Sequence, residues 1–105
     1  MINLIMEEEQ RFPLPNKSKG EMFAIAEQHM GAGRIKVACE DGKSRMGRIP
    51  GKIKKRKWIK NGDLLIVRPW EFQDEKADII YRYTRTQIAN LLRKNLIPDS
   101  INVFT

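Results

Sequence analysis

Hydrophobic and polar residues alternate along several short segments of this 105-residue chain. The clearest alternation runs over residues 34–39, where apolar side chains occupy every second position. A period of two is typical of a strand with one buried face, so this segment is predicted to be a half-buried strand. Arg34 and Lys36 then face outward, and Cys39 falls on the apolar side as a predicted core residue.

Four further segments are predicted to be strands, each bounded by turn residues such as Asp41-Gly42. They are residues 22–28, 44–49, 64–67 and 77–83. The third of these is a continuous apolar run, which indicates a buried strand. Pro69 should end the pairing of that strand or place it at an edge, because proline donates no backbone hydrogen bond. Three aromatic residues are predicted to lie in the core: Phe23, Tyr81 and Tyr83.

A helix is predicted after the last strand. Thr84 and Gln87 have the spacing of a capping box, in which each side chain satisfies a free backbone N–H at the helix start. Three apolar residues then share one helical face: Ile88, Leu91 and Leu92. Asn95 and Pro98 should end the helix.

Five short strands and one terminal helix predict an all-β fold with a C-terminal α-helix. Curling into a barrel removes exposed strand edges, so we expect a five-stranded OB-fold; an SH3-like barrel would fit the same strand count. The expected organisation is a flexible N-terminal tail over residues 1–20, a barrel over residues 21–83, and a helical extension over residues 84–105.

The charge of the chain is uneven. Lys and Arg number 20 against 13 Asp and Glu, a net charge of +7. Residues 16–60 alone hold thirteen Lys and Arg against four acidic residues, a net of +9. A localised basic field predicts a polyanionic partner, either nucleic acid or an anionic membrane surface. No apolar stretch approaches the roughly 18 residues of a membrane-spanning helix, and a single cysteine fits a reducing, cytoplasmic environment.

Residues 43–60 contain nine Lys and Arg, no acid, and Trp58. Cations neutralise phosphates, and an aromatic ring offers a face for stacking of a base. A solvated charged loop or a localisation-type signal is the alternative interpretation, and Trp58 could equally plug the barrel. Arg45, Met46 and Arg48 are expected to extend the outward face of the predicted strand over residues 34–39. The candidate RNA-binding residues are Arg34, Lys36, Arg45, Arg48, Lys52, Lys54, Lys55, Arg56, Lys57 and Trp58.

Catalytic and metal-binding patterns are not found in the sequence. His29 and Cys39 lack ligand spacing, and Gly31-Ala32-Gly33 lacks the spacing of a phosphate-binding loop. His29, beside a turn, is predicted to be a surface residue. A nuclease would need paired acids or a histidine dyad. We therefore predict that the protein is not an enzyme and uses no cofactor or metal.

Two long motifs resemble those of the translation initiation factor 1A family, in its archaeal form, which is related to bacterial initiation factor 1. Residues 51–59 are similar to the family's basic motif ending in Trp-Ile, and residues 73–80 match its Gln-Asp-x-Lys-Ala-Asp segment. Gly33-Arg34 and Asp41-Gly42 match as well, and the similarity covers about residues 20–100. Pro50 stands where eukaryotic members carry an arginine.

The resemblance implies an OB-fold with a helical extension that binds the decoding A site of the small ribosomal subunit through ribosomal RNA. It further implies that the protein promotes initiator tRNA binding, an indirect partner, and assembly of the initiation complex. Initiation factor 5B and initiation factor 1 are further implied partners. A monomer is expected from the charge. The alternative is a generic single-stranded RNA-binding OB or S1-like domain, against which the lack of aromatic residues over residues 34–49 counts.

Overall fold

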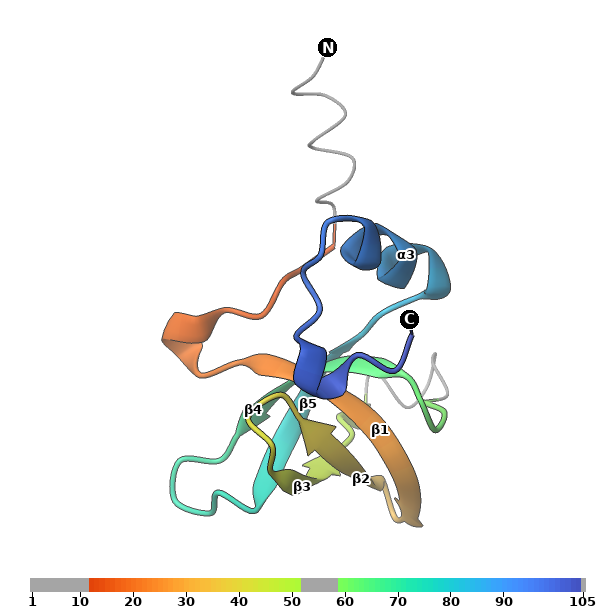
Figure 1. The fold of residues 1–105 in the computed structure, drawn as a ribbon. Helices are drawn as coiled ribbons and strands as arrows, with labels where there is room; N and C mark the ends of the chain where they lie inside the picture. Colours follow the sequence, from red (N-terminus) through yellow and green to blue (C-terminus); the bar gives the residue numbers. More distant parts are fainter. Residues whose placement is uncertain (1–11, 52–58, 105) are drawn as a thin grey trace.

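The structure is a computed structural model that describes residues 12–51 and 59–104. Five strands, one α-helix and two short 3₁₀ turns are formed by these residues (Figure 1). The strands are β1 (Met22–Gly31), β2 (Arg34–Cys39), β3 (Ser44–Arg48), β4 (Leu64–Pro69) and β5 (Lys76–Arg82). The helix is α3 (Arg85–Arg93), and the turns are η1 (Lys17–Lys19) and η2 (Asp99–Ile101).

The strands close into a barrel in the order β1-β2-β3-β5-β4, with β4 pairing back onto β1. Only the β3–β5 pair is parallel among the described strands; the other pairs are antiparallel. Within the described residues, closure gives each strand two paired neighbours, which protects strand edges from association with another chain. The predicted five-stranded OB-type barrel with a C-terminal helix is therefore confirmed.

The barrel interior is filled by alternate side chains of every strand, as a period of two requires. β2 shows this pattern most simply, with Ile35 and Val37 buried between exposed Arg34 and Lys36. Gly47 of β3 faces inward, where a side chain would crowd the neighbouring strand. A Cβ atom there would lie 3.1 Å from the carbonyl oxygen of Ile35. The prediction of Cys39 as a core residue is confirmed, since it is 2% exposed.

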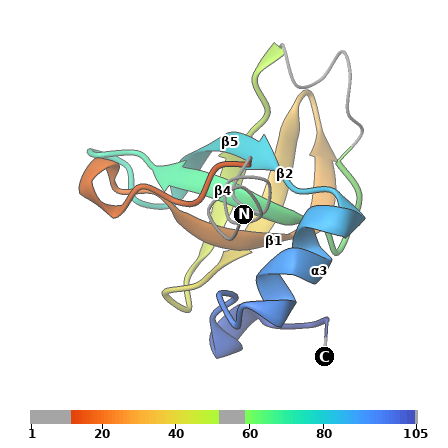
Figure 2. The same ribbon diagram turned by 90° about the horizontal axis from the view of Figure 1, so that it is seen from above.

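A second apolar layer covers the outer face of β1 and β4, beneath α3 and the C-terminal segment (Figure 2). β4 is therefore buried on both faces, which explains its continuous apolar run. The pairing of β4 with β1 ends at Val67, while Pro69 still pairs with Ala77 of β5. Pro69 therefore lies at an edge on the side of β1, which is one of the two predicted outcomes. The residues buried in this layer are Phe23, Ile25, Leu64, Ile66, Tyr83, Leu91, Ile97 and Ile101.

The ends of α3 are fixed by local hydrogen bonds. Thr84 Oγ1 accepts from the Gln87 N–H, and Gln87 Oε1 accepts from the Thr84 N–H, so the predicted capping box is confirmed. At the other end, Asn95 adopts a left-handed conformation with φ of 57°. The N–H groups of Asn95 and Leu96 then reach back to the Leu92 and Leu91 carbonyls, satisfying groups the helix leaves free.

Part of the expected N-terminal tail packs against the barrel and α3. The hydroxyl of Tyr83 donates to the Pro13 carbonyl oxygen at 2.6 Å, and the Phe12 ring meets the Tyr83 ring edge-on at 5.8 Å. Burial raises the pKa of Tyr83 above its ordinary value, so this hydroxyl stays protonated and remains a donor. Residues 1–11 of the predicted tail lie outside the described residues.

Candidate nucleic-acid interface

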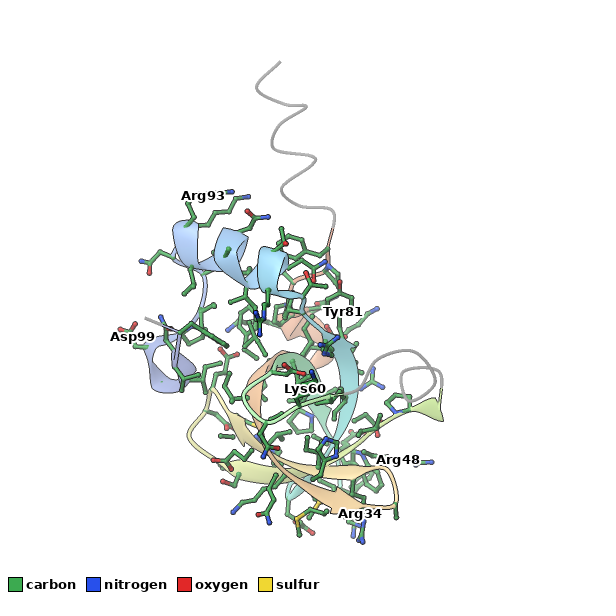
Figure 3. The ribbon with its side chains drawn as sticks, turned by 90° about the vertical axis from the view of Figure 1, so that its right-hand side faces the viewer. Arg34, Arg48, Lys60, Tyr81, Arg93 and Asp99 are labelled. Atoms are coloured by element: carbon green, nitrogen blue, oxygen red, sulfur yellow. The ribbon has the colours of Figure 1, made fainter. Side chains whose placement is uncertain are left out.

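Arg34 and Arg48 are the centre of the exposed strand face. They are directly opposite each other in the antiparallel β2–β3 register. Figure 3 shows both side chains pointing away from the barrel. Neither forms an ion pair with another described residue. Like charges directly opposite across a strand pair are destabilising, so this pair does not stabilise the isolated protein.

More cations lie on the same face across the neighbouring strands. Lys36 pairs with Met46, which pairs in turn with Lys76 of β5. Arg68 on β4 is exposed and pairs in register with Asp78 of β5. Asp78 in turn pairs with Arg48 of β3. We call this surface, which includes Met46 and Trp70, the basic face; its cations are Arg34, Lys36, Arg48, Arg68 and Lys76.

Trp70 is an aromatic component of the basic face that sequence reasoning missed. Its indole N–H donates to Asp78 Oδ1 at 3.1 Å, and Lys76 Nζ lies 5.3 Å from its ring centroid. This ring flanks a hollow of about 120 Å³ that Arg34 and Arg48 also line. The sequence around Trp70 does not predict this position. Trp70 contacts Lys76 and Asp78 of β5, and the parallel β3–β5 pairing then brings it close to β3.

A larger hollow of about 380 Å³ adjoins the first on the other side of Arg48. Arg68 and the Asp78 carboxylate also line it, together with Pro50 and Gly51. The two hollows place arginine side chains beside apolar surface, an arrangement suited to a phosphodiester chain with unpaired bases.

The predicted position of Arg45 on the outward face is wrong. Arg45 is only 4% exposed and lies on the inward side of β3, with Gly47. Met46 and Arg48 have the opposite parity and face outward, so those two placements are confirmed. Strand alternation alone requires this result, since Arg45 is three residues from Arg48.

Arg45 is held by two carboxylates from different loops, and we call this group the arginine clasp. Its guanidinium nitrogens donate to Asp41 at 2.9 and 3.1 Å, and to the Asp74 carboxylate at 3.1 and 3.2 Å. Its Nε donates to the Asp74 carbonyl oxygen at 2.7 Å. Lys43 Nζ adds an exposed ion pair with Asp74 at 3.0 Å. The clasp joins the β2–β3 turn to the β4–β5 loop.

The clasp keeps its groups ionised. Burial alone would lower the pKa of Arg45, but hydrogen bonds with Asp41, Cys39 and Asp74 outweigh it and raise that pKa. The hydrogen bond from Arg45 lowers the pKa of Asp41, and those from Lys43 and Arg45 lower the pKa of Asp74. With its donors already engaged by carboxylates, Arg45 is a structural residue in this fold.

The basic loop predicted to contact RNA lies outside the described residues from Lys52 to Trp58, so its six candidate residues have no structural outcome. Its flanks are described. Gly51 is exposed and lines the larger hollow, and Ile59 is 3% exposed in the barrel core. His29, exposed on β1 as predicted, contacts the Ile59 carbonyl oxygen through Nε2. Of the two flanks, Gly51 lies beside Arg48 and Arg68 of the basic face.

Comparison with known protein families shows which family this chain belongs to. The family described as "Translation initiation factor 1A / IF-1" matches residues 9–103, nearly the whole chain. The chain belongs to this family. The predicted resemblance is thereby confirmed, and with it a role in translation initiation.

Archaeal members of the translation initiation factor 1A family are among the proteins similar to this chain. Translation initiation factor 1A of Picrophilus torridus is 61% identical over 90 residues, covering 86% of this chain and 83% of the relative. That of Thermoplasma acidophilum is 56% identical over 94 residues, covering 90% and 79%. That of Thermococcus kodakarensis is 58% identical over 88 residues, covering 83% and 75%.

Among solved structures, the crystal structure of YjeQ from Thermotoga maritima is similar in fold. The TM-score is 0.52 at 19% identity, over 62% of this chain and 23% of that protein's length. At this identity the likeness concerns the barrel alone. Within the described part of the chain, no helix is long and apolar enough to cross a membrane. No cluster of three or more potential metal ligands forms among those same residues.

Proposed function

We propose that this initiation factor 1A family member binds the decoding A site of the small ribosomal subunit and contacts ribosomal RNA there through the basic face. In this role it promotes initiator tRNA binding, without contacting that tRNA directly, and assembly of the initiation complex. It acts as a cytoplasmic monomer and as a binding protein rather than an enzyme. Initiation factor 5B and initiation factor 1 are proposed neighbours on the subunit.

The opposed pair Arg34 and Arg48 is the observation that carries this proposal. Two arginines that face each other without a carboxylate partner in the described residues gain most when phosphates lie between or beside them. Lys36, Arg68 and Lys76 extend the positive field over four strands. The loop of Lys52, Lys54, Lys55, Arg56, Lys57 and Trp58 supplies five further cations and an aromatic ring in sequence.

The second candidate function, a generic single-stranded RNA binder, gains support from Trp70. An aromatic ring beside Arg34 and Arg48 supplies the stacking surface that the sequence of β2 and β3 lacks. Ring stacking is tolerant of base identity, so such a protein should bind short unstructured RNA well by itself. The family membership favours the initiation role, in which the subunit is the preferred partner.

Co-sedimentation with isolated small ribosomal subunits at several salt concentrations tests both candidates. If about six phosphates are neutralised, the logarithm of affinity should fall with the logarithm of salt concentration with a slope of about −4 to −5. A short unstructured RNA serves as the control, and the subunit should be strongly preferred. A salt-insensitive affinity would contradict the electrostatic mechanism, and equal affinity for the two partners would favour the generic RNA binder.

A further inference from the structure

The β4–β5 loop, residues 70–75, presents apolar and acidic side chains next to the basic face. It stands out from the barrel at the lower left of Figure 1. Phe72 in this loop is 93% exposed, more than any other large hydrophobic residue with a described exposure. Glu71 and Glu75 are exposed on the same loop. An aromatic ring between carboxylates differs from the arginine-rich surface of β2 and β3.

The loop is braced at both ends, so the exposure of Phe72 belongs to a fixed conformation. The Trp70 N–H donates to the Lys76 carbonyl oxygen at 2.9 Å, and the Lys76 N–H donates to the Gln73 carbonyl oxygen at 2.9 Å. The Met46 N–H donates to the Glu75 carbonyl oxygen at 2.8 Å. Arg45 of the arginine clasp also donates hydrogen bonds to the carbonyl oxygen and the carboxylate of Asp74. The loop is therefore preorganised around Phe72.

The charges around Phe72 disfavour nucleic acid at this point. Glu71 and Glu75 flank it in the loop, and their carboxylates would repel a phosphate backbone. Two cations that contact the loop are held by loop residues: Lys43 pairs with Asp74, and the Lys76 ammonium lies over the Trp70 ring. Positive side chains on a protein partner would complement this loop, and an apolar pocket between them would take the ring.

We propose that the β4–β5 loop is a protein-docking element. Phe72 inserts into an apolar pocket on a basic, lysine- or arginine-rich protein segment, whose cations pair with Glu71 and Glu75. This inference rests on the proposed function, because the small subunit that offers the RNA also offers the protein surface. The basic face and the loop thus divide recognition between RNA and protein.

Site-specific photocross-linking on purified small subunits tests the division. Phe72→p-benzoylphenylalanine should cross-link to a ribosomal protein within a segment rich in Lys and Arg. The matched label Met46→p-benzoylphenylalanine, on the basic face, should cross-link to ribosomal RNA. Exchanging Glu71→Lys and Glu75→Lys should reduce the cross-link from position 72 and leave that from position 46 in place.

An affinity measurement gives a second readout. Phe72→Ala should weaken subunit binding roughly tenfold while the salt slope stays unchanged, because an apolar anchor releases no counterions. Val103→Ala, which truncates another exposed apolar side chain, should leave affinity unchanged. Cross-links to RNA alone or to nothing from position 72, with RNA cross-links from position 46, would overturn the docking proposal and leave the proposed function intact. Absence of cross-links from both positions and of co-sedimentation would overturn both.

Discussion

Replacing both Arg34 and Arg48 with glutamine is expected to weaken binding to isolated small ribosomal subunits by roughly 100-fold. Each arginine contributes about 1.5 kcal/mol through charge-assisted hydrogen bonds to phosphate, and about 1.4 kcal/mol corresponds to a factor of ten. The salt slope should become shallower by about 2, one for each lost phosphate contact. Equilibrium binding at several salt concentrations measures both quantities.

Stability distinguishes a binding role for these arginines from a structural one. Because the double replacement removes two like charges that face each other across β2 and β3, the free energy of unfolding should stay constant or rise slightly. The matched control neutralises two exposed cations elsewhere, Lys19→Gln and Arg85→Gln, and should change affinity less than about threefold. Equal losses in the two double variants would mean that only net charge matters, and the basic face would lose its assignment.

Replacing Arg45 with methionine is expected to destabilise the fold by about 2–3 kcal/mol, since it leaves two carboxylates without their shared partner. The figure is at the lower end for a broken buried pair, because the side chains of Asp41 and Asp74 are 33% and 55% exposed. The melting temperature should fall by about 10–20 °C, measured by thermal unfolding at neutral pH. RNA binding by the folded variant should be retained, because Arg45 is buried.

The pH dependence of stability separates the clasp from ordinary packing. The pKa values of Asp41 and Asp74 are lowered in the folded protein, so their contribution is present above the unfolded pKa of about 3.9. It is lost as the pH falls through their lower folded pKa values.

Arg45→Met should remove much of this acid-dependent loss of stability. Lys43→Met breaks only the exposed pair with Asp74 and should destabilise the fold much less than Arg45→Met does. Equal destabilisation by the two variants would contradict the clasp.

Much of the barrel could be predicted from the sequence because its signals are local. Alternation over residues 34–39 gave the bounds of β2, and the spacing of Thr84 and Gln87 gave the start of α3. Which strands pair with each other could not be predicted in this way, because the paired residues lie far apart in the sequence. The parallel pairing of β3 with β5 joins residues 30 positions apart, such as Met46 and Lys76, and no periodicity contains that information.

The sequence predicts the site less well than the fold, because the cluster of cations over residues 43–60 suggests an outward Arg45 where strand parity places it inward. Counting in steps of two from Arg48 places Arg45 inward, which the structure bears out. A buried arginine is tolerated only where carboxylates meet it, and Asp74 lies 29 residues away in sequence. Trp70 was missed for a related reason. It follows Pro69 in a segment without alternation, and only tertiary contacts bring it to the basic face.

Chemical footprinting of ribosomal RNA in small subunits saturated with the protein is the most direct test of binding to the decoding A site through the basic face. We expect protection confined to the decoding A site, and loss of that protection with the Arg34→Gln and Arg48→Gln double variant at the same protein concentration. Protection spread over many RNA helices, or unchanged by the double variant, would contradict it.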